Sequence, residues 1–126
     1  MKKIIKSLYS KIKKTIRIGK SSNEVQKLAL GKLLLKRNKL KKIEKIEDIE
    51  FKIFSQFGDD GIIQFLIDKL EIDYEYQNFI EFGVEDYSEA NTRFLLLNNN
   101  WSGLVLDSSN ENIENIKKKI FFGNLS

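Results

Sequence analysis

Apolar and basic positions alternate along the first forty residues with the spacing of amphipathic helices. Five apolar residues at intervals of one, three and four fall on one narrow arc: Ile5, Leu8, Tyr9, Ile12 and Ile16. They predict a helix over residues 2–17 that ends before Gly19. The S-x-x-E spacing of Ser21 and Glu24 is typical of a capping box and predicts a second helix from about Ser22. Its expected apolar face consists of Val25, Leu28, Leu35 and Leu40.

A charged connector over residues 38–50 leads to a different pattern, in which short apolar runs alternate with helical segments. Asp59 or Asp60 is expected to cap a helix with a broad and therefore buried apolar face. That face consists of Ile62, Ile63, Phe65, Leu66 and Leu70. Residues 78–84 predict a strand, and Ser88 is expected to cap the next helix. That helix contains Ala90, Phe94, Leu95 and Leu97.

The last third of the sequence repeats the same alternation. Ser102-Gly103 predicts a turn, residues 104–107 a second buried strand, residues 110–119 a helix and residues 120–122 the start of a third strand. Alternating strands and helices, with each strand a continuous apolar run, indicate an α/β fold whose parallel sheet is covered by helices on both faces. We therefore predict a basic helical extension over residues 1–50 and an α/β domain over residues 51–126.

Composition narrows the chemistry open to this chain. At 126 residues it suits one domain, and it contains neither cysteine nor histidine. Thiol chemistry, disulfide bonds, imidazole catalysis and the usual zinc ligands are therefore excluded. The sequence has no run of eighteen uncharged apolar residues and no secretory signal pattern, so we expect a cytoplasmic protein.

Charge is distributed unevenly along the chain. Residues 1–50 carry sixteen basic and five acidic side chains, whereas residues 51–126 carry six and thirteen, for a net charge of +4. Lysine outnumbers arginine nineteen to three, in a chain also rich in isoleucine and asparagine, which is the bias of an AT-rich genome. Lysine richness alone is therefore weak evidence for an anionic partner.

Acidic residues stand where the two predicted parallel strands end. Glu81 and Gly83 close the first strand, and Asp107 follows the second after a 26-residue step. Ligands of open parallel sheets bind outside these carboxyl ends. In nucleoside-binding units, glycine lets the backbone approach the ligand and the second acidic residue accepts hydrogen bonds from ribose hydroxyls. The spacing fits such a site, although an ordinary loop and strand end would give the same residues.

Several short motifs, in order and in spacing, resemble the opening of FkbM-like, S-adenosylmethionine-dependent methyltransferases. They are Ser55-Gln56-Phe57-Gly58-Asp59-Asp60-Gly61, Phe79-Ile80-Glu81-Phe82-Gly83-Val84, Asn91-Thr92-Arg93, and Trp101-Ser102-Gly103-Leu104 followed by Asp107. The resemblance covers roughly residues 50–126. It implies a Rossmann-like class I methyltransferase fold and methyl transfer to an oxygen, often a sugar or polyketide hydroxyl, mainly by holding donor and acceptor in line.

The resemblance also implies which residues bind the cofactor. They are Glu81, Gly83, Val84, Asp107, Gln56 and Asp60. The segment from Glu81 to Val84 would hold the methionine part of S-adenosylmethionine, with Gly83 making the closest backbone approach. Asp107 would bind the ribose, and Gln56 and Asp60 would lie near the mouth of the site.

The chain departs from the family pattern at two points. Glu85 and Tyr87 stand where the glycine-rich turn of class I methyltransferases has further glycines. Residues 51–126 also supply two or three strands, whereas such a sheet has about six. We therefore expect a truncated domain that lacks the acceptor site and a general base, is inactive alone, and self-associates through an exposed sheet edge.

The basic N-terminal segment supports a different class of function. Residues 2–17 could lie on an anionic membrane surface, which would make the protein a non-catalytic membrane or partner adapter. Nucleic acid is disfavoured as a partner, because arginine is scarce and stacking aromatics are not interleaved with the lysines.

Three other features have plain structural explanations. The acidic pairs Asp59-Asp60 and Glu85-Asp86 lack the alternating ligand positions of a calcium loop, so no metal site is predicted. Arg93 is expected either to reach a carboxylate of cofactor or substrate, or to pair with Glu89 four residues earlier. Trp101 is expected to anchor the core at a turn.

Overall fold

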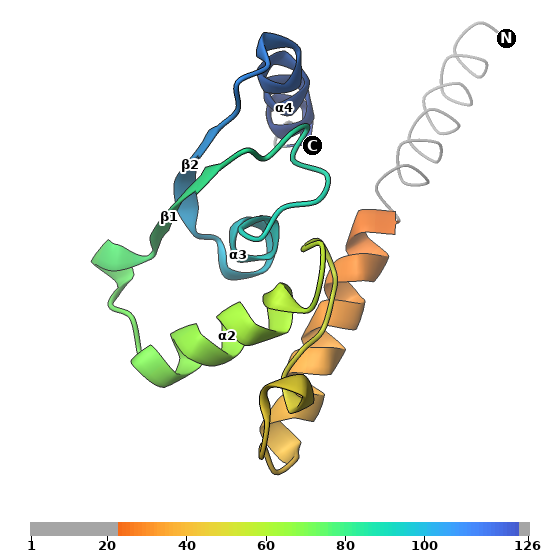
Figure 1. The fold of residues 1–126 in the computed structure, drawn as a ribbon, viewed down its shortest axis with the longest axis vertical. Coiled ribbons are helices and arrows are strands. Elements are labelled where there is room, and N and C mark those ends of the chain that lie inside the picture. The colour runs from red at the N-terminus through yellow and green to blue at the C-terminus, as the bar shows by residue number, and fades with distance from the viewer. Residues whose placement is uncertain (1–22, 124–126) are drawn as a thin grey trace, which may run out of the picture.

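The computed structural model of the chain describes residues 23–123, which form several helices and a small parallel sheet (Figure 1). Residues 23–40 are helical, and the 3-10 helix η1 spans Ile46–Asp48. The elements that follow are α2 (Asp59–Leu70), the 3-10 helix η2 (Tyr74–Tyr76), β1 (Asn78–Phe82), α3 (Arg93–Asn99), β2 (Ser102–Leu106) and α4 (Asn110–Gly123). The helix predicted over residues 2–17 lies outside this range.

The two strands confirm the predicted α/β class. They pair in parallel, from Asn78 opposite Ser102 to Phe82 opposite Leu106. A parallel pair needs a crossover between its strands, and the loop after β1 together with α3 supplies it. The carboxyl ends of both strands therefore lie at the same edge of the sheet.

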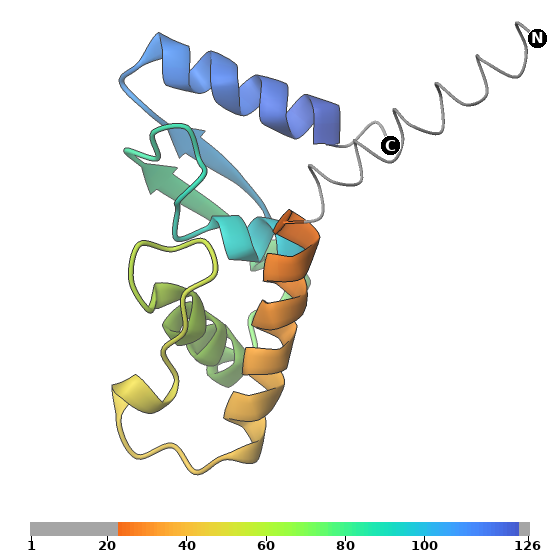
Figure 2. The same cartoon turned by 90° about the vertical axis from the view of Figure 1, so that its right-hand side faces the viewer.

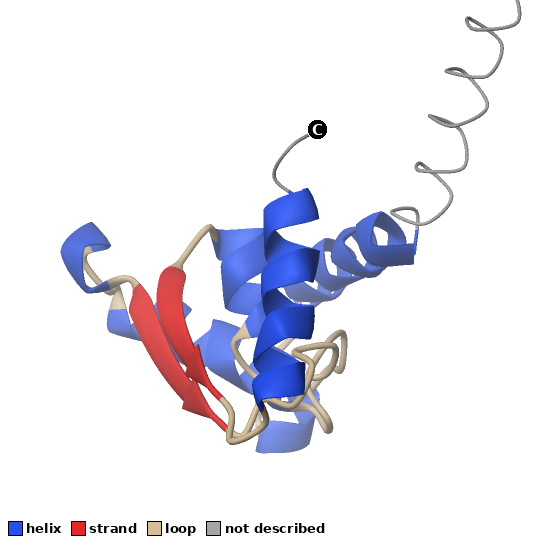
Figure 3. Cartoon of the chain, turned by 90° about the horizontal axis from the view of Figure 1, so that it is seen from above, coloured by secondary structure: helices blue, strands red, loops and turns tan. Residues whose placement is uncertain are grey.

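The prediction that helices cover both faces of the sheet is wrong for the described residues. Figure 3 shows the longer helices gathered on one side of the strands, with only the short helix η2 set apart from them. Along β1, Phe79 and Glu81 are half-buried, whereas Ile80 and Phe82 point to the other face and are exposed. A continuous apolar run shows that both faces of a strand are apolar, but it does not show that each face has a partner.

Two element boundaries also differ from the prediction. Ser102 and Gly103 open β2 instead of forming a turn, because Gly103 lies opposite Phe79 in the sheet. A Cβ atom on Gly103 would lie 2.3 Å from the Phe79 ring, so the glycine makes room for this aromatic side chain. The third strand expected at residues 120–122 is wrong, because α4 continues to Gly123.

The helix over residues 23–40 packs on the larger of two apolar clusters. Figure 2 shows its N-terminal half crossing close to α3. The cluster is formed by Phe51, Ile53, Phe54 and Phe94, with Leu28, Leu34, Leu35 and Leu97 packed against it. The expected apolar face is thus confirmed at Leu28 and Leu35, but Val25 and Leu40 are 60% and 80% exposed. The contact is centred on Gly31, which lies directly against Phe94.

The second cluster lies between the loop after β1, strand β2 and helix α4. It consists of Val84, Tyr87, Ala90 and Ile116, with Leu96, Val105 and Ile113 around it. This cluster fixes the loop on the covered face of the sheet. Trp101 is also buried, which confirms its predicted place in the core.

Helix α2 is less buried than its broad apolar face predicts. Its buried residues are Asp60, Gly61 and Gln64, whereas Leu66 and Leu70 are 49% and 68% exposed. The apolar width of the helix therefore exceeds the surface against which it packs. No helix among residues 23–123 combines the length and the apolar character needed to cross a bilayer.

Candidate functional site

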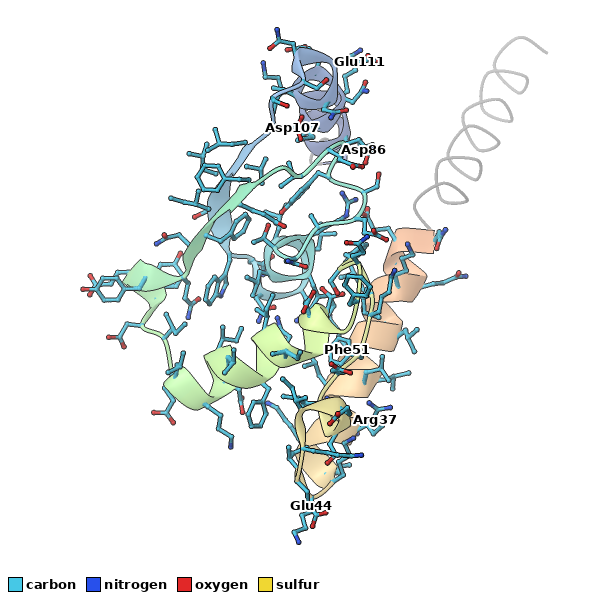
Figure 4. The ribbon with its side chains drawn as sticks, in the orientation of Figure 1. Arg37, Glu44, Phe51, Asp86, Asp107 and Glu111 are labelled. Atoms are coloured by element: carbon cyan, nitrogen blue, oxygen red, sulfur yellow. The ribbon has the colours of Figure 1, made fainter. Side chains whose placement is uncertain are left out.

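The carboxyl ends of β1 and β2 bring together two of the predicted site residues. The Gly83 N–H donates to the Leu106 carbonyl oxygen at 2.8 Å, which extends the strand pairing by one residue. The Glu85 N–H donates to Asp107 Oδ2 at 2.8 Å. Figure 4 shows Asp107 at the end of β2, near Asp86 in the loop after β1 and Glu111 at the start of α4. Gly83 and Asp107 thus flank one rim of the sheet.

The loop after β1 has the backbone of a glycine-rich turn at three alternate positions. Gly83, Glu85 and Tyr87 have φ angles of 67°, 50° and 61°, all in the left-handed region that favours glycine. Glu85 and Tyr87, which stand where the methyltransferase family has glycines, therefore adopt the left-handed backbone conformation that glycine favours. A Cβ atom on Gly83 would meet no atom within 4 Å, so the space beside this backbone is open.

Glu85 gives a direct test of the strain in this loop. Glu85→Gly is expected to leave the free energy of unfolding unchanged or to raise it by up to about 1 kcal/mol, because glycine removes the left-handed penalty. The exposed Glu85 side chain makes no hydrogen bond or ion pair with the other residues of 23–123, since the bond to Asp107 uses its backbone. Urea unfolding measures the change.

Tyr87→Gly is the matched comparison, because Tyr87 has a similar φ but only 2% exposure. This change should cost at least about 3 kcal/mol through the loss of a core aromatic. A loss above about 1 kcal/mol in Glu85→Gly would show instead that the Glu85 side chain stabilises the loop.

The Asp107 carboxylate already has several partners within the protein. Oδ1 accepts the Ser109 N–H at 2.9 Å and the Asn112 side-chain amide at 3.0 Å, while Oδ2 accepts the Glu85 N–H. The Ser109 and Asn112 donors, with Glu85, lower the pKa of the Asp107 carboxyl, which is therefore ionised at neutral pH. A carboxylate has about four acceptor positions, so Oδ2 keeps one for a hydroxyl group.

The Glu81 side chain lies on the covered face and fixes the loop before α3. Its oxygens accept hydrogen bonds from the backbone N–H groups of Asn91 and Thr92, each at 3.0 Å, and from the Thr92 hydroxyl. The Thr92 hydroxyl also lies 3.0 Å from the Tyr87 hydroxyl, and burial raises the pKa of Tyr87. The sequence pattern gave no role to Thr92, which closes this network.

Helix α3 begins later than predicted. Thr92 precedes its first residue, whereas Ser88, the expected cap, bonds to Asp86 two residues earlier. Lys119 of α4 contacts both Asp86 and Ser88, and the Lys119 ammonium lowers the pKa of the Asp86 carboxyl. These bonds attach the loop to α4.

Val84 is 2% exposed and belongs to the second apolar cluster. Its side chain is therefore occupied in the core, and only its backbone could face a ligand at the rim.

Asp60 is buried at 1% exposure and organises the chain before α2. Its Oδ2 accepts the backbone N–H groups of Ile53, Phe54 and Ser55 at 2.7–2.9 Å, and also the Ser55 hydroxyl. The prediction that Asp59 or Asp60 caps α2 is wrong, since Gly58 is the N-cap and the side chain that reaches the first turn is that of Ser55, whose hydroxyl accepts the Asp60 N–H at 3.1 Å. The carboxyl group of Asp60 instead holds a loop.

The Asp60 loop lies beside the loop after β1. The Ala90 N–H donates to the Phe54 carbonyl oxygen at 2.9 Å, and Lys52 pairs with Glu89 at 3.3 Å. Gln56 is exposed, and its backbone carbonyl oxygen accepts a hydrogen bond from the Lys52 ammonium. Gln56 is therefore near the loop after β1, but its contact with a cofactor stays a prediction.

Arg93 does not pair with Glu89 as expected, because Lys52 takes that carboxylate. Its guanidinium instead pairs with Glu24 of the 23–40 helix and donates to the Tyr87 carbonyl oxygen. It also lies over the Phe54 ring at 5.2 Å. Arg93 thus joins the helix to the loop after β1, a long-range contact that helix spacing cannot reveal.

Three surface cavities of about 400, 310 and 270 Å³ adjoin the 23–40 helix. Glu81, Gly83 and Asp107 line none of the three. The rim between Gly83 and Asp107 is therefore separate from these three cavities.

Comparison with known proteins yields no match to this chain among family models, curated proteins or solved structures.

Proposed function

We propose that residues 51–119 form the opening part of a class I methyltransferase-like domain that binds S-adenosylmethionine at the carboxyl ends of β1 and β2. The observation that carries the proposal is the open, left-handed backbone at Gly83 beside the Asp107 carboxylate. A backbone segment with open space beside it, next to a carboxylate that accepts hydrogen bonds, is suited to a nucleoside with ribose hydroxyls.

The residues have separate roles in this proposal. Gly83 lets the ligand approach the backbone, and the remaining acceptor position of Asp107 Oδ2 takes a ribose hydroxyl. Glu81 acts as a positioning residue, because its oxygens hold Asn91 and Thr92. Val84 fixes the loop by packing in the core.

The loop conformation supports the proposal where the sequence pattern departs from the family. Strained left-handed backbone at non-glycine residues costs about 1–2 kcal/mol per residue and is concentrated at ligand sites. Glu85 and Tyr87 both adopt this conformation, and the Glu85 N–H orients Asp107. The left-handed backbone at two non-glycine positions thus supports the proposal, because it is the conformation that the two missing glycines would favour.

S-adenosylmethionine, when bound, would supply an electrophilic methyl group on a sulfonium. The acceptor implied by the resemblance is an oxygen nucleophile, such as a sugar or other small-molecule hydroxyl. For the described residues we therefore propose cofactor binding at the rim. Sheets of this class have about six strands, whereas the described residues supply two.

Thermal unfolding with and without ligand tests the proposal. S-adenosylmethionine or its demethylated product at about ten times Kd should stabilise the protein by about 1.4 kcal/mol and raise Tm by several degrees. Asp107→Ala should abolish this rise, because the ribose loses its acceptor. The comparison is made within each variant, since Asp107→Ala also removes the hydrogen bonds that Asp107 accepts from Glu85, Ser109 and Asn112.

Asp73→Ala is the matched control. Asp73 is an exposed carboxylate that precedes β1, at the opposite end of that strand from the rim. This variant should keep the full ligand-induced rise in Tm. Absence of a rise in the unmutated chain at millimolar ligand, or an equal rise in Asp107→Ala, would reject the proposed site.

A further inference from the structure

The uncovered face of the sheet presents an apolar surface made by both strands. Its four large side chains form two adjacent pairs, Ile80 with Leu104 and Phe82 with Leu106. Their exposures are 63%, 53%, 74% and 39%, in the same order. Figure 3 shows the strands with the longer helices on their other side. We call these four residues the open face.

The size of the open face can be compared with that of known interfaces. With about 200 Å² for each large apolar residue, the four exposures leave roughly 450 Å² accessible on one chain. Exposed apolar patches of several hundred Å² mark interaction sites. A stable interface buries about 800 Å² on each partner, and weak interfaces bury less. The area therefore fits a weak association.

The chemistry of this side of the sheet favours a partner with an identical surface. Its remaining strand positions are Asn78 and Ser102, so none of the six side chains is charged. In a twofold dimer the same patch meets itself, and any charge would face a like charge. An uncharged apolar patch avoids this repulsion. It also offers no charge complement to a basic amphipathic segment such as residues 2–17.

We propose that the open face packs against the open face of a second copy of this chain, forming a weak twofold dimer of two stacked sheets. Stacked sheets lie about 10 Å apart with interdigitating side chains, which suits two pairs of aliphatic and aromatic residues. The Asp107 carboxylate is not part of the open face, because it bonds to the loop after β1, to Ser109 and to α4 on the covered side of the strands.

Sedimentation equilibrium of the full chain tests this proposal. The mean mass should rise from monomer towards dimer between micromolar and millimolar concentration. Leu104→Lys and Leu104→Glu should each remain monomeric at every concentration, because each places like charges in the contact. An equimolar mixture of the two variants should regain dimer, because the opposite charges then meet.

Leu33→Lys is the control, since Leu33 is 65% exposed on the 23–40 helix, away from the strands. It should dimerise as the unmutated chain does. Circular dichroism establishes that each variant is folded. A monomeric unmutated chain at all concentrations would overturn the proposal, and so would dimerisation of Leu104→Lys alone or a mixture that stays monomeric.

Discussion

Asp60→Ala is expected to lower the free energy of unfolding by about 3 kcal/mol or more. The substitution leaves the N–H groups of Ile53, Phe54 and Ser55 without their acceptor. Each buried donor left unsatisfied costs about 1 kcal/mol or more. Since small domains have only about 5–15 kcal/mol of stability, the loss would be a large part of the total.

Urea unfolding of Asp59→Ala and Asp60→Asn, beside Asp60→Ala, separates the loss of the loop's hydrogen bonds from the general effect of removing a charge from α2. Asp59 shares the first turn of α2 but is only partly buried, so Asp59→Ala should cost less than about 1 kcal/mol. Asp60→Asn keeps one acceptor oxygen and should fall between the two alanine variants. Equal losses for Asp59→Ala and Asp60→Ala would contradict the assigned role.

Gly61→Ala is expected to destabilise the protein by about 3 kcal/mol or more, although alanine is the better helix former by about 1 kcal/mol. A Cβ atom at this position would lie 2.1 Å from the Ile49 carbonyl oxygen and 2.6 Å from the Phe51 nitrogen. Both are backbone atoms, which cannot move aside as a flexible side chain does. The Gly61 N–H also donates to the Phe51 carbonyl oxygen at 3.2 Å.

Gly83→Ala is the comparison that separates steric from conformational cost. Its Cβ atom would meet nothing within 4 Å, but the φ of 67° is unfavourable for alanine. The expected loss is therefore about 1–2 kcal/mol. Thermal or urea unfolding of both variants gives the order, and a smaller loss for Gly61→Ala than for Gly83→Ala would show that α2 can shift away from residues 49–51.

The contacts of Asp60 and Gly61 explain the first motif that resembles the methyltransferase family, which runs from Ser55 to Gly61. Ser55 and Asp60 are buried together, and Gly61 lets α2 begin in close contact with residues 49–51. The motif therefore builds the support beside the loop after β1, to which it is joined by the Ala90 to Phe54 hydrogen bond. Its residues can be explained by local structure without direct contact to a cofactor.

Much of the element order could be predicted from the sequence alone. Apolar periodicity and turn residues depend on neighbours a few positions apart, and they correctly predict the helix near residue 23, both strands and the helix from Asn110. The parallel arrangement also follows, because strands alternate with helices. The meeting of Gly83 and Asp107 at one rim is a direct consequence of that arrangement.

Side-chain partners could not be predicted in this way. Arg93 pairs with Glu24, which is 69 positions away, and Glu81 bonds to Asn91 and Thr92 across the loop. Gln64 likewise reaches Asn99 at 2.8 Å from another helix. Such contacts depend on how the elements pack, and several carboxylates compete for each donor.

The amino-acid order thus determines the α/β class, the parallel strands and the placement of an acidic residue and a glycine at their carboxyl ends, because these depend on local periodicity and chain direction. Only the tertiary structure decides that Glu85 and Tyr87 adopt glycine-like backbone, that Asp60 holds a loop, and that residues 23–123 leave one face of the sheet uncovered. The physical reason is that strain, buried hydrogen bonds and coverage depend on atoms brought together from distant parts of the chain.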